Sequence, residues 1–510
     1  MKRTTRPGWY GAVAGLAAAL AALGSSELIA SFSARLPSPV VAVGDLVIDL
    51  VPPPIKDFAI RLFGTNDKIA LLAGILLVTL GYATAVGIVA ERRGLNFGRI
   101  GIGLFGLLGA AAALIGQSGL IGMVPSVSGA GVGMLVLGWI LASRLDPEAS
   151  GPEPAGLALG RRAFVFRAAS ATLVGLVGAA GGRWLVGAGQ SDPVGGQLSL
   201  ADRPLPPLPP GTDLEIEGLT PFVTSNAAFY RIDTALEIPR VQISDYTLRV
   251  TGMVERPLNL SFQQLTERPL VEADITLTCV SNEVGGKLAG NARWLGVRLD
   301  DLLAEAGIDP AADQIVGRSI DGYSCGFPVA TLDGRDALVA IAMNGEPLPL
   351  EHGFPVRLIV PGLYGYVSAT KWLTEIELTT FDSFDHYWVP RGYSAEAPIK
   401  TQSRIDTPGP LARIASGPIA IAGVAWAQTR GIEAVEVRVD DGPWEVARLG
   451  PEVNDSTWRQ WTVTWDASPG QHSITCRATD SSGSTQTEDR ARPAPNGATG
   501  WHSLVVIVDG

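Results

Sequence analysis

Hydrophobic residues are concentrated in the first 190 residues of the chain, where long apolar runs alternate with short polar loops. A helix that crosses a bilayer needs about 20 apolar residues. Five runs are long enough, at residues 9–30, 69–90, 99–118, 124–143 and 165–187. Small residues four apart, such as Gly129 and Gly133, favour close packing of such helices. The pattern therefore predicts an α-helical membrane domain of about five spans over residues 1–190.

A sixth apolar stretch, residues 38–64, is interrupted by Pro52-Pro53-Pro54 and by several charged residues. Because a charge near the bilayer centre is costly, we interpret this stretch as a re-entrant or interfacial segment. Glu27, late in the first run, is either a functional intramembrane carboxylate or a residue of the outer interface, and we expect the second. The charged residues of the interrupted stretch are Asp45, Asp49, Lys56, Asp57 and Arg61.

Basic residues predict the orientation of this domain. With five spans, all of the basic flanks fall on one side, which the positive-inside rule makes cytoplasmic. The chain would then be a multi-pass cell-membrane protein whose residues after 190 are extracytoplasmic. The flanks contain Lys2, Arg3, Arg6, Arg92, Arg93, Arg99, Arg144, Arg161, Arg162 and Arg167.

The segment Arg161-Arg162-Ala163-Phe164-Val165-Phe166-Arg167 precedes a mildly hydrophobic run rich in Gly and Ala. It resembles a twin-arginine export signal placed inside the chain. The positive flank of an ordinary membrane helix explains the same residues equally well. The difference matters because the twin-arginine route exports folded proteins, which suits a domain that acquires a cofactor in the cytoplasm.

The second half of the chain alternates short strand patterns with turns. Residues 191–215 hold six prolines among polar residues and predict an extended linker. Residues 216–390 mix both periodicities and predict an α+β domain. In it, Val241–Val254 alternates as a strand, and Leu299–Ala306 is typical of a short helix that ends at Gly307.

Residues 391–510 show only strand patterns. Val435, Val437 and Val439 alternate with polar residues ahead of the turn Asp440-Asp441-Gly442, and Trp461, Val463 and Trp465 share one strand face. About seven short strands predict an immunoglobulin-like β-sandwich, with Cys476 as a buried core thiol.

Composition excludes several classes of function. A net charge of −11 without a basic tract argues against nucleic-acid binding. Three cysteines form neither a disulfide scaffold nor a CxxC zinc site. Haem ligation by two histidines within the bilayer is also excluded, because no histidine lies in residues 1–190. The four histidines of the chain are His352, His386, His472 and His502.

Cys279 is the residue of this chain whose side chain offers the most reactive chemistry. It lies in Thr276-Leu277-Thr278-Cys279-Val280-Ser281-Asn282-Glu283 and can be a soft metal ligand, a nucleophile or a buried inert thiol. Downstream, His352, Arg357 and Lys371 are three potential cations beside glycine-rich turns. Such a set suits an anionic group, because Arg offers a planar fork and Lys a point charge.

Together these segments resemble the sulfite oxidase family of molybdenum enzymes. The resemblance covers about residues 216–510, including the C-terminal domain, which dimerises in that family and predicts a homodimer. The motifs are Leu277-x-Cys279-x-x-Asn282, Asn344-Gly345-Glu346-Pro347-Leu348-Pro349, His352-Gly353-Phe354-Pro355-x-Arg357 and Lys371-Trp372-Leu373.

The resemblance implies a molybdopterin cofactor carrying molybdenum. Cys279 would be the protein thiolate on the metal, and Tyr393 would be a second catalytic residue near the metal oxo group. By the same resemblance, the cofactor would be bound by Asn226, Asp321, His352, Arg357 and Lys371.

Four positions depart from the sulfite oxidases of that family. Ser225 replaces an Arg and Ala227 a His, while Glu283 and Val284 stand where the family has Arg residues. Because a dianionic substrate needs nearby cations, we expect two-electron oxygen-atom transfer with a small neutral substrate, such as a sulfoxide or N-oxide. Electrons would pass to a separate partner, a cytochrome or a quinone-linked protein, because the chain has no haem or iron–sulfur motif.

Two other functions stay open. The domain could have lost its cofactor and serve as a cell-envelope binding or scaffold protein. It could also be a thiol hydrolase with Cys279 as nucleophile and His352 or His386 as base. A disulfide between Cys279 and Cys325 would block metal ligation, and we expect Cys325 to be a free thiol.

Overall fold

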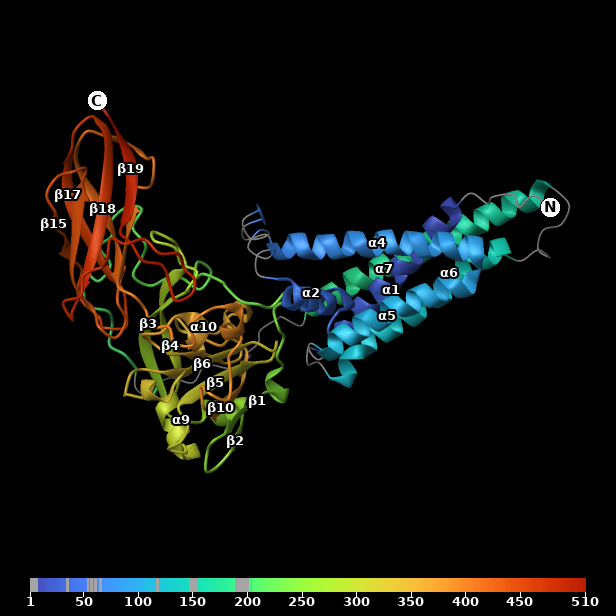
Figure 1. Cartoon of the computed structure of the whole chain (residues 1–510), viewed down its shortest axis with the longest axis horizontal. Coiled ribbons are helices and arrows are strands. Elements are labelled where there is room, and N and C mark those ends of the chain that lie inside the picture. Colours follow the sequence, from blue (N-terminus) through green and yellow to red (C-terminus); the bar gives the residue numbers. More distant parts are fainter. Residues whose placement is uncertain are drawn as a thin grey trace. The chain divides into compact units, whose positions relative to one another are not determined.

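The computed structural model describes residues 8–33, 36–52, 67–115, 119–145, 154–188, 201–202 and 204–510, with Ile55, Phe58, Leu62 and Phe63. The chain forms two compact units. The first comprises Met1–Pro193 with Ala235–Ile238, and the second comprises Val194–Thr234 with Pro239–Gly510. The first unit is helical and the second consists mainly of strands (Figure 1).

Among the described residues, five helices of the first unit are long and apolar enough to cross a membrane, as the hydrophobic pattern predicts. The last three residues of the predicted run 99–118, residues 116–118, lie outside the described part of the chain. The helices of this unit are α1 Trp9–Ala30, α2 Pro39–Leu50, α4 Asp67–Arg93, α5 Leu95–Ile115, η2 Leu120–Met123, α6 Val124–Leu145 and α7 Pro154–Ala188.

Helix α1 packs against α4, α6 and α7 (Figure 1). Glycines permit these contacts, because a Cβ on Gly15 would overlap the backbone of Ala83 and one on Gly24 would overlap that of Gly175. A Cβ on Gly129 would likewise overlap the Ser26 hydroxyl. The predicted role of small residues in close helix packing is thus confirmed at Gly129.

Helix α2 is too short to span a bilayer, because its 12 residues extend about 18 Å. Ser38 caps it by accepting a hydrogen bond from the Val40 amide at 3.2 Å. The Ser38 hydroxyl also donates to the Glu27 carboxylate at 2.5 Å, so Glu27 joins the end of α1 to the start of α2. Outside the described residues lie Pro53, Pro54, Lys56, Asp57 and Arg61 of the predicted interfacial segment.

The arginine pair at 161 and 162 lies within α7, exposed to the surroundings of the unit. The helix begins at Pro154 and continues through the pair, so the last predicted span is part of a longer helix. Arg167 donates to the Trp139 carbonyl at 2.8 Å and so ties α7 to α6. The N-terminal basic residues Lys2, Arg3 and Arg6 lie outside the described residues.

The region predicted as an α+β domain contains two sheets and three short α-helices. The first sheet has the order β3-β4-β7-β8, with β9 paired to β7. Its strands are β3 Leu270–Thr278, β4 Ala289–Arg298, β7 Leu338–Met343, β8 Glu346–Pro347 and β9 Arg357–Ile359.

The second sheet has the order β2-β1-β10-β5-β6, and its β1–β10 pair is parallel. Its strands are β1 Thr247–Gly252, β2 Leu258–Ser261, β5 Gln314–Ser319, β6 Ser324–Pro328 and β10 Leu373–Thr379. The helices of this region are α8 Phe262–Thr266, α9 Leu299–Ala306 and α10 Gly365–Ser368, and the 3-10 turns are η3 Ile243–Asp245, η4 Val329–Thr331, η5 Leu350–His352 and η6 Val389–Arg391.

The predicted helix Leu299–Ala306 is confirmed as α9, which ends at Gly307 with φ +72°. The predicted strand Val241–Val254 is wrong in extent. A 3-10 turn occupies its start, and the strand β1 is closed by Gly252 at φ +81°, where the backbone approaches Leu378 too closely for a side chain.

Residues beyond 400 form two further sheets that share one core. The predicted turn at Asp440-Asp441-Gly442 joins β14 to β15, and Trp461, Val463 and Trp465 lie together against the core. The immunoglobulin type and the boundaries at 190, 215 and 390 stay predictions. The strands are β11 Gln402–Thr407, β12 Arg413–Ala415, β13 Gly417–Trp426, β14 Ile432–Val439, β15 Glu445–Val446, β16 Arg448–Leu449, β17 Arg459–Ala467, β18 Gly470–Asp480 and β19 His502–Asp509.

The C-terminal sheets support strand β3, which leads into Cys279. Trp458 donates its backbone N–H to the Thr276 hydroxyl at 2.8 Å and its indole N–H to the Phe222 carbonyl at 2.9 Å. Gln428 donates to the Thr276 carbonyl at 2.9 Å. These groups are buried, so the strand before the cysteine is fixed from the C-terminal side.

His502, the first residue of β19, is held in its neutral form. The Ile405 amide donates to its Nδ1 at 2.9 Å, and Gly285 lies against the ring. Protonation of Nδ1 would break that bond. Burial is the main cause that lowers the pKa of His502 from 6.5 to about 4, and the charge of Arg404 lowers it further.

We therefore expect the chain to lose stability between pH 6.5 and pH 4, where the unfolded chain binds a proton at His502 and the folded chain does not. The loss is about 1–2 kcal/mol once partial exposure to solvent is allowed for. His502→Asn keeps an acceptor but cannot titrate, so its stability should depend less on pH across this window. Thermal unfolding followed by tryptophan fluorescence tests this, and an equal pH dependence in both proteins would contradict it.

Candidate active site

Cys279 follows directly after β3 and begins a tight turn. Its N–H donates to the Leu288 carbonyl at 2.9 Å, and its carbonyl accepts from the Asn282 N–H at 3.0 Å. The Ser281 amide points at the Cys279 sulfur, 3.4 Å away. The Asn282 side chain closes the loop by accepting from the Leu288 N–H at 2.8 Å. The Leu-x-Cys-x-x-Asn motif therefore fixes the position of the thiol.

The Cys279 thiol is buried, with 7% of the residue exposed. Burial raises its pKa, while the Ser281 amide and the charge of Lys371 oppose that rise. The thiol is thus uncharged at neutral pH. All three cysteines are free and buried, so the expectation of a free Cys325 and of a buried Cys476 is confirmed.

His352 and Asn226 are joined through the backbone. The imidazole Nε2 donates to the Asn226 carbonyl at 2.9 Å, and burial lowers the pKa of His352. The Asn226 side chain donates to Glu346 at 3.0 Å and accepts from Asn344 at 2.9 Å. Two segments that the sequence separates by more than one hundred residues are therefore fixed together.

Arg357, the first residue of β9, is a buried cation with an incomplete set of partners. One terminal nitrogen donates to the His352 carbonyl at 2.9 Å, and the guanidinium lies 5.0 Å from the centre of the Trp294 ring. Its Nε–H is buried and has no partner among the residues that the structure describes. Burial lowers the pKa of Arg357 to about 10, so it is still protonated at neutral pH.

Lys371 lies beside Arg357 and has one acidic partner. Its ammonium donates to the Asp233 carboxylate at 2.7 Å and to the Glu351 carbonyl at 3.1 Å. Burial lowers the pKa of Lys371 to about 8, although Asp233 opposes the shift. Gly353 lies against the Cβ atoms of both Arg357 and Lys371, and its φ of +110° and these close contacts leave no room for a side chain there.

Asp321 lies within electrostatic reach of this group. Burial raises the pKa of its carboxyl group, as does the charge of Asp233, while Lys371 lowers it. The Tyr323 amide donates to the Asp321 carboxyl group at 3.2 Å and so orients it. The side chain can therefore serve as donor or acceptor depending on its protonation.

Tyr393 lies in a neighbouring aromatic cluster rather than among the cations. Its ring is 5.5 Å from Tyr366 and 5.0 Å from Trp388. Tyr366 in turn donates to the Ser394 carbonyl at 2.8 Å and accepts at its own carbonyl from the Tyr323 hydroxyl at 2.6 Å. Hydrogen bonds and electrostatic interactions link the other six predicted residues pairwise, whereas Tyr393 lies in the aromatic cluster with Tyr366 and Trp388.

Three residues of the site were missed by sequence reasoning. Asp233 pairs with Lys371, Glu346 holds Asn226, and the half-buried Tyr230 lies within electrostatic reach of both Cys279 and Arg357. Tyr230 and Asp233 follow Asn226 closely in the sequence, which is the one available signal. Lys371, Glu346's partner Asn226 and Arg357 lie more than one hundred residues away along the chain, whereas Asp233 also pairs with the nearby Arg231 at 2.8 Å.

Known proteins match this part of the chain. The family model described as an oxidoreductase molybdopterin binding domain matches residues 235–388. Human mitochondrial sulfite oxidase is 30% identical over 341 residues, 56% of this chain and 62% of that protein. Chicken (Gallus gallus) sulfite oxidase is 30% identical over 337 residues, 55% of this chain and 72% of that protein. The chain thus spans less than two thirds of the human protein.

A bacterial relative and a solved structure agree with these matches. The uncharacterised oxidoreductase YuiH of Bacillus subtilis is 34% identical over 151 residues, 30% of this chain and 73% of that protein. The crystal structure of the sulfane dehydrogenase SoxCD from Paracoccus pantotrophus shares the fold with a TM-score of 0.50 and 23% identity, over 58% of this chain and 85% of that one. The chain therefore belongs to the sulfite oxidase family of molybdopterin-binding oxidoreductases.

Proposed function

We propose that this protein is a membrane-anchored, extracytoplasmic oxidoreductase that moves an oxygen atom to or from a small neutral substrate. The observation that carries the proposal is the buried Arg357, whose Nε–H has no partner among the described residues although Lys371 adds a second positive charge beside it. A buried charge is costly unless it is paired. Arg357 and Lys371 therefore form a preformed site for a buried anion.

The residues present fit molybdopterin. Arg357 and Lys371 would hold its phosphate, because a guanidinium fork and an ammonium are the strong partners of phosphate oxygens. His352 and Asn226 would border the pterin, and Asp321 would hydrogen-bond it. The bound cofactor would supply the two-electron chemistry of molybdenum, which no side chain of the protein can provide.

Cys279 would contribute the protein ligand. Its sulfur is soft, and its turn is fixed by the Leu288 and Asn282 hydrogen bonds, so the ligand is positioned before metal arrives. Metal binding would release the thiol proton. Tyr393, in the aromatic cluster with Tyr366 and Trp388, is the second residue that we propose to act in catalysis.

The charges around the site favour a neutral substrate over sulfite. Ser225 and Ala227 are exposed and uncharged where the sulfite oxidases have Arg and His, and Glu283 is an exposed carboxylate. A dianion would therefore meet little compensating charge, whereas a sulfoxide or an N-oxide needs none.

Membrane anchoring rests on the five apolar helices of the first unit and on the basic residues that flank them. The Arg161-Arg162 pair supports export of a folded domain, although it lies within α7. We further propose that a separate cytochrome or quinone-linked protein exchanges electrons with the site. Dimerisation through the C-terminal sheets belongs to the same proposal.

The geometry opposes a thiol hydrolase. The Nε2 of His352 points to the Asn226 carbonyl, and burial raises the pKa of Cys279 where a nucleophile needs it lowered. The cofactor-free scaffold stays the alternative, and it predicts a purified protein without molybdenum or pterin. The unpartnered Nε of Arg357 argues against it.

Metal and pterin analysis of the purified full chain, followed by turnover assays with an artificial electron carrier, tests the proposal. We expect about one molybdenum per chain and turnover of dimethyl sulfoxide or trimethylamine N-oxide well above that of sulfite. Ser225→Arg, on an exposed position, should raise sulfite turnover relative to the sulfoxide, because it returns a cation to the entrance. Absence of both molybdenum and pterin would refute the enzyme, and dominant sulfite turnover would refute the substrate class.

A further inference from the structure

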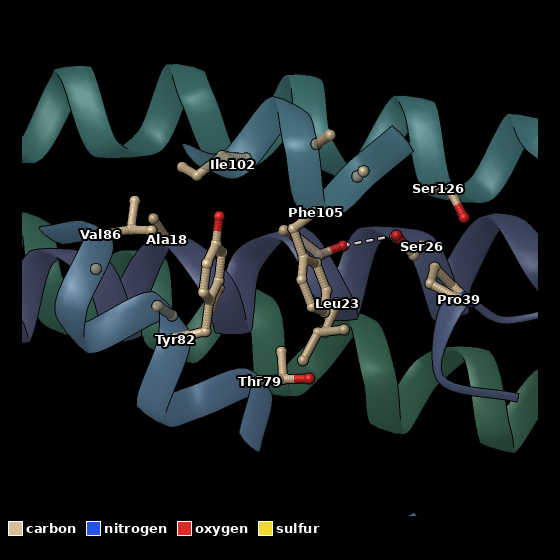
Figure 2. A pocket seen from close by; sticks show the side chains of 17 residues that line it. Ala18, Leu23, Ser26, Pro39, Thr79, Tyr82, Val86, Ile102, Phe105 and Ser126 are labelled. Atoms are coloured by element: carbon tan, nitrogen blue, oxygen red, sulfur yellow. Dashed lines mark hydrogen bonds between the residues drawn. The ribbon is translucent and has the colours of Figure 1, made fainter. Parts of the chain in front are cut away.

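The helices of the first unit border a pocket that the proposed chemistry of the second unit does not use. Residues of α1, α4, α5 and α6, with Pro39 at the start of α2, line the pocket, and Ala18 is one of the small side chains on α1 (Figure 2).

Close helix contacts hold the walls of this pocket in place. Gly15 brings α1 against the backbone of α4 at Ala83, and Gly129 brings α6 against Ser26 of α1. Both glycines line the pocket, so the helices cannot approach further to fill it. Because protein interiors are normally packed without large voids, a space that rigid contacts keep open is suited to a ligand.

One wall of the pocket is aromatic. The rings of Tyr82 on α4 and Phe105 on α5 are 5.7 Å apart and inclined by 27° (Figure 2). The Tyr82 hydroxyl donates to the Gly101 carbonyl at 2.9 Å, which fixes the ring. Tyr82 is 37% exposed, so the pocket reaches the outer surface of the bundle. A flat ligand could enter there from the bilayer and pack on these rings.

Ser126 supplies a polar group at one end of the pocket. The residue is 4% exposed, and its hydroxyl has no partner among the described residues. Figure 2 shows this hydroxyl near Ser26 and Pro39. Ser26 differs, because its own hydroxyl donates to the carbonyls of Ala22 and Pro125, each at 2.9 Å. An unpaired hydroxyl in an apolar medium is costly, so the occupant should carry an acceptor.

We propose that this pocket binds a quinone-headed lipid, whose neutral ring packs against Tyr82 and Phe105 and whose ring carbonyl accepts a hydrogen bond from Ser126. The described lining residues are all uncharged, which disfavours phosphate and carboxylate headgroups. A plain acyl chain would leave Ser126 unpaired. The inference rests on the proposed membrane-spanning role of these helices and is independent of the chemistry in the second unit.

Titration of decylubiquinone into the purified full chain in detergent micelles, with empty micelles as blank, tests the inference. We expect one saturable site per chain. Ser126→Ala should weaken binding about tenfold, as loss of one buried hydrogen bond does, and Ser126→Thr should restore most of it. Ser25→Ala is the matched control, because Ser25 does not line the pocket and its hydroxyl donates to Ala22 at 2.9 Å; its binding should match the wild type.

Several outcomes would overturn the proposal. The first is decylubiquinone binding to the protein in micelles that is no greater than binding to empty micelles, and the second is unchanged affinity in Ser126→Ala. The third is equal competition by hexadecane or by cholesterol, which would indicate a site for acyl chains or sterols. If Ser126→Ala loses helicity, Phe105→Leu replaces it, and unchanged affinity there would count equally against the proposal. Molybdenum content of the same samples separates the two proposals: metal without quinone binding rejects only the pocket, and quinone binding without metal rejects only the enzyme.

Discussion

Cys279→Ser is expected to abolish turnover, by about three orders of magnitude or more, while the protein stays folded. The hydroxyl of serine is a hard, weakly acidic group and cannot replace a thiolate as a soft ligand of the metal. The turn around it should persist, because the hydrogen bonds to Leu288 and Asn282 involve the backbone of residue 279. The loss should therefore appear in turnover and in the sulfur-to-molybdenum charge-transfer bands. The midpoint of thermal unfolding should not change.

Cys476→Ala is the matched control for this variant. Cys476 is fully buried in the C-terminal core, and the hydroxyl of its neighbour Ser403 keeps a second partner in Gln486 at 2.8 Å. Its loss should cost roughly 1–2 kcal/mol of stability through the small cavity and leave turnover per molybdenum unchanged. Retained turnover in Cys279→Ser, or an equal loss in Cys476→Ala, would contradict the assignment of Cys279 as metal ligand.

Local patterns predicted the parts of the fold that depend on neighbouring residues. The apolar runs gave the five long helices, and Leu299–Ala306 gave α9 with its glycine end, because helix periodicity and capping are short-range properties. The strand predicted at Val241–Val254 failed in extent, because its end is set by the approach of Leu378 to Gly252, which no local pattern reveals.

The candidate site was predicted through motifs, and its missing members are those that act across the chain. Asp233 neutralises Lys371 over a separation of 138 residues, and its acidic side chain has no distinguishing sequence context. Trp458 and Gln428 of the C-terminal region hold Thr276 ahead of Cys279, which the separate domain patterns did not indicate. The pocket in the first unit was equally hidden, because alanines that line a space and alanines that pack closely give the same pattern.

Arg357→Met is expected to change stability and cofactor binding in opposite directions. In the cofactor-free protein this buried guanidinium has a pKa lowered to about 10 from 12.5, which corresponds to about 3 kcal/mol spent on burying the charge. Methionine fills much of the same volume without a charge. After loss of the hydrogen bond to the His352 carbonyl, worth about 1 kcal/mol, the cofactor-free variant should be about 1–2 kcal/mol more stable than the wild type. The same variant should lose most of its molybdopterin, because the phosphate loses its charged fork.

Thermal unfolding of full chains produced without molybdenum cofactor synthesis, together with molybdenum analysis of chains produced with it, measures both effects. Arg293→Met is the matched control, because the Arg293 guanidinium pairs with the buried Asp274 at 2.7 Å and donates to the Pro206 carbonyl at 3.3 Å, and neither partner belongs to the proposed phosphate site. Its removal leaves Asp274 unpaired, so the cofactor-free protein should become less stable while molybdenum content is retained. If Arg357→Met instead destabilised the cofactor-free protein as Arg293→Met does, and bound molybdenum as the wild type does, Arg357 would be a structural cation and the anion site would be refuted.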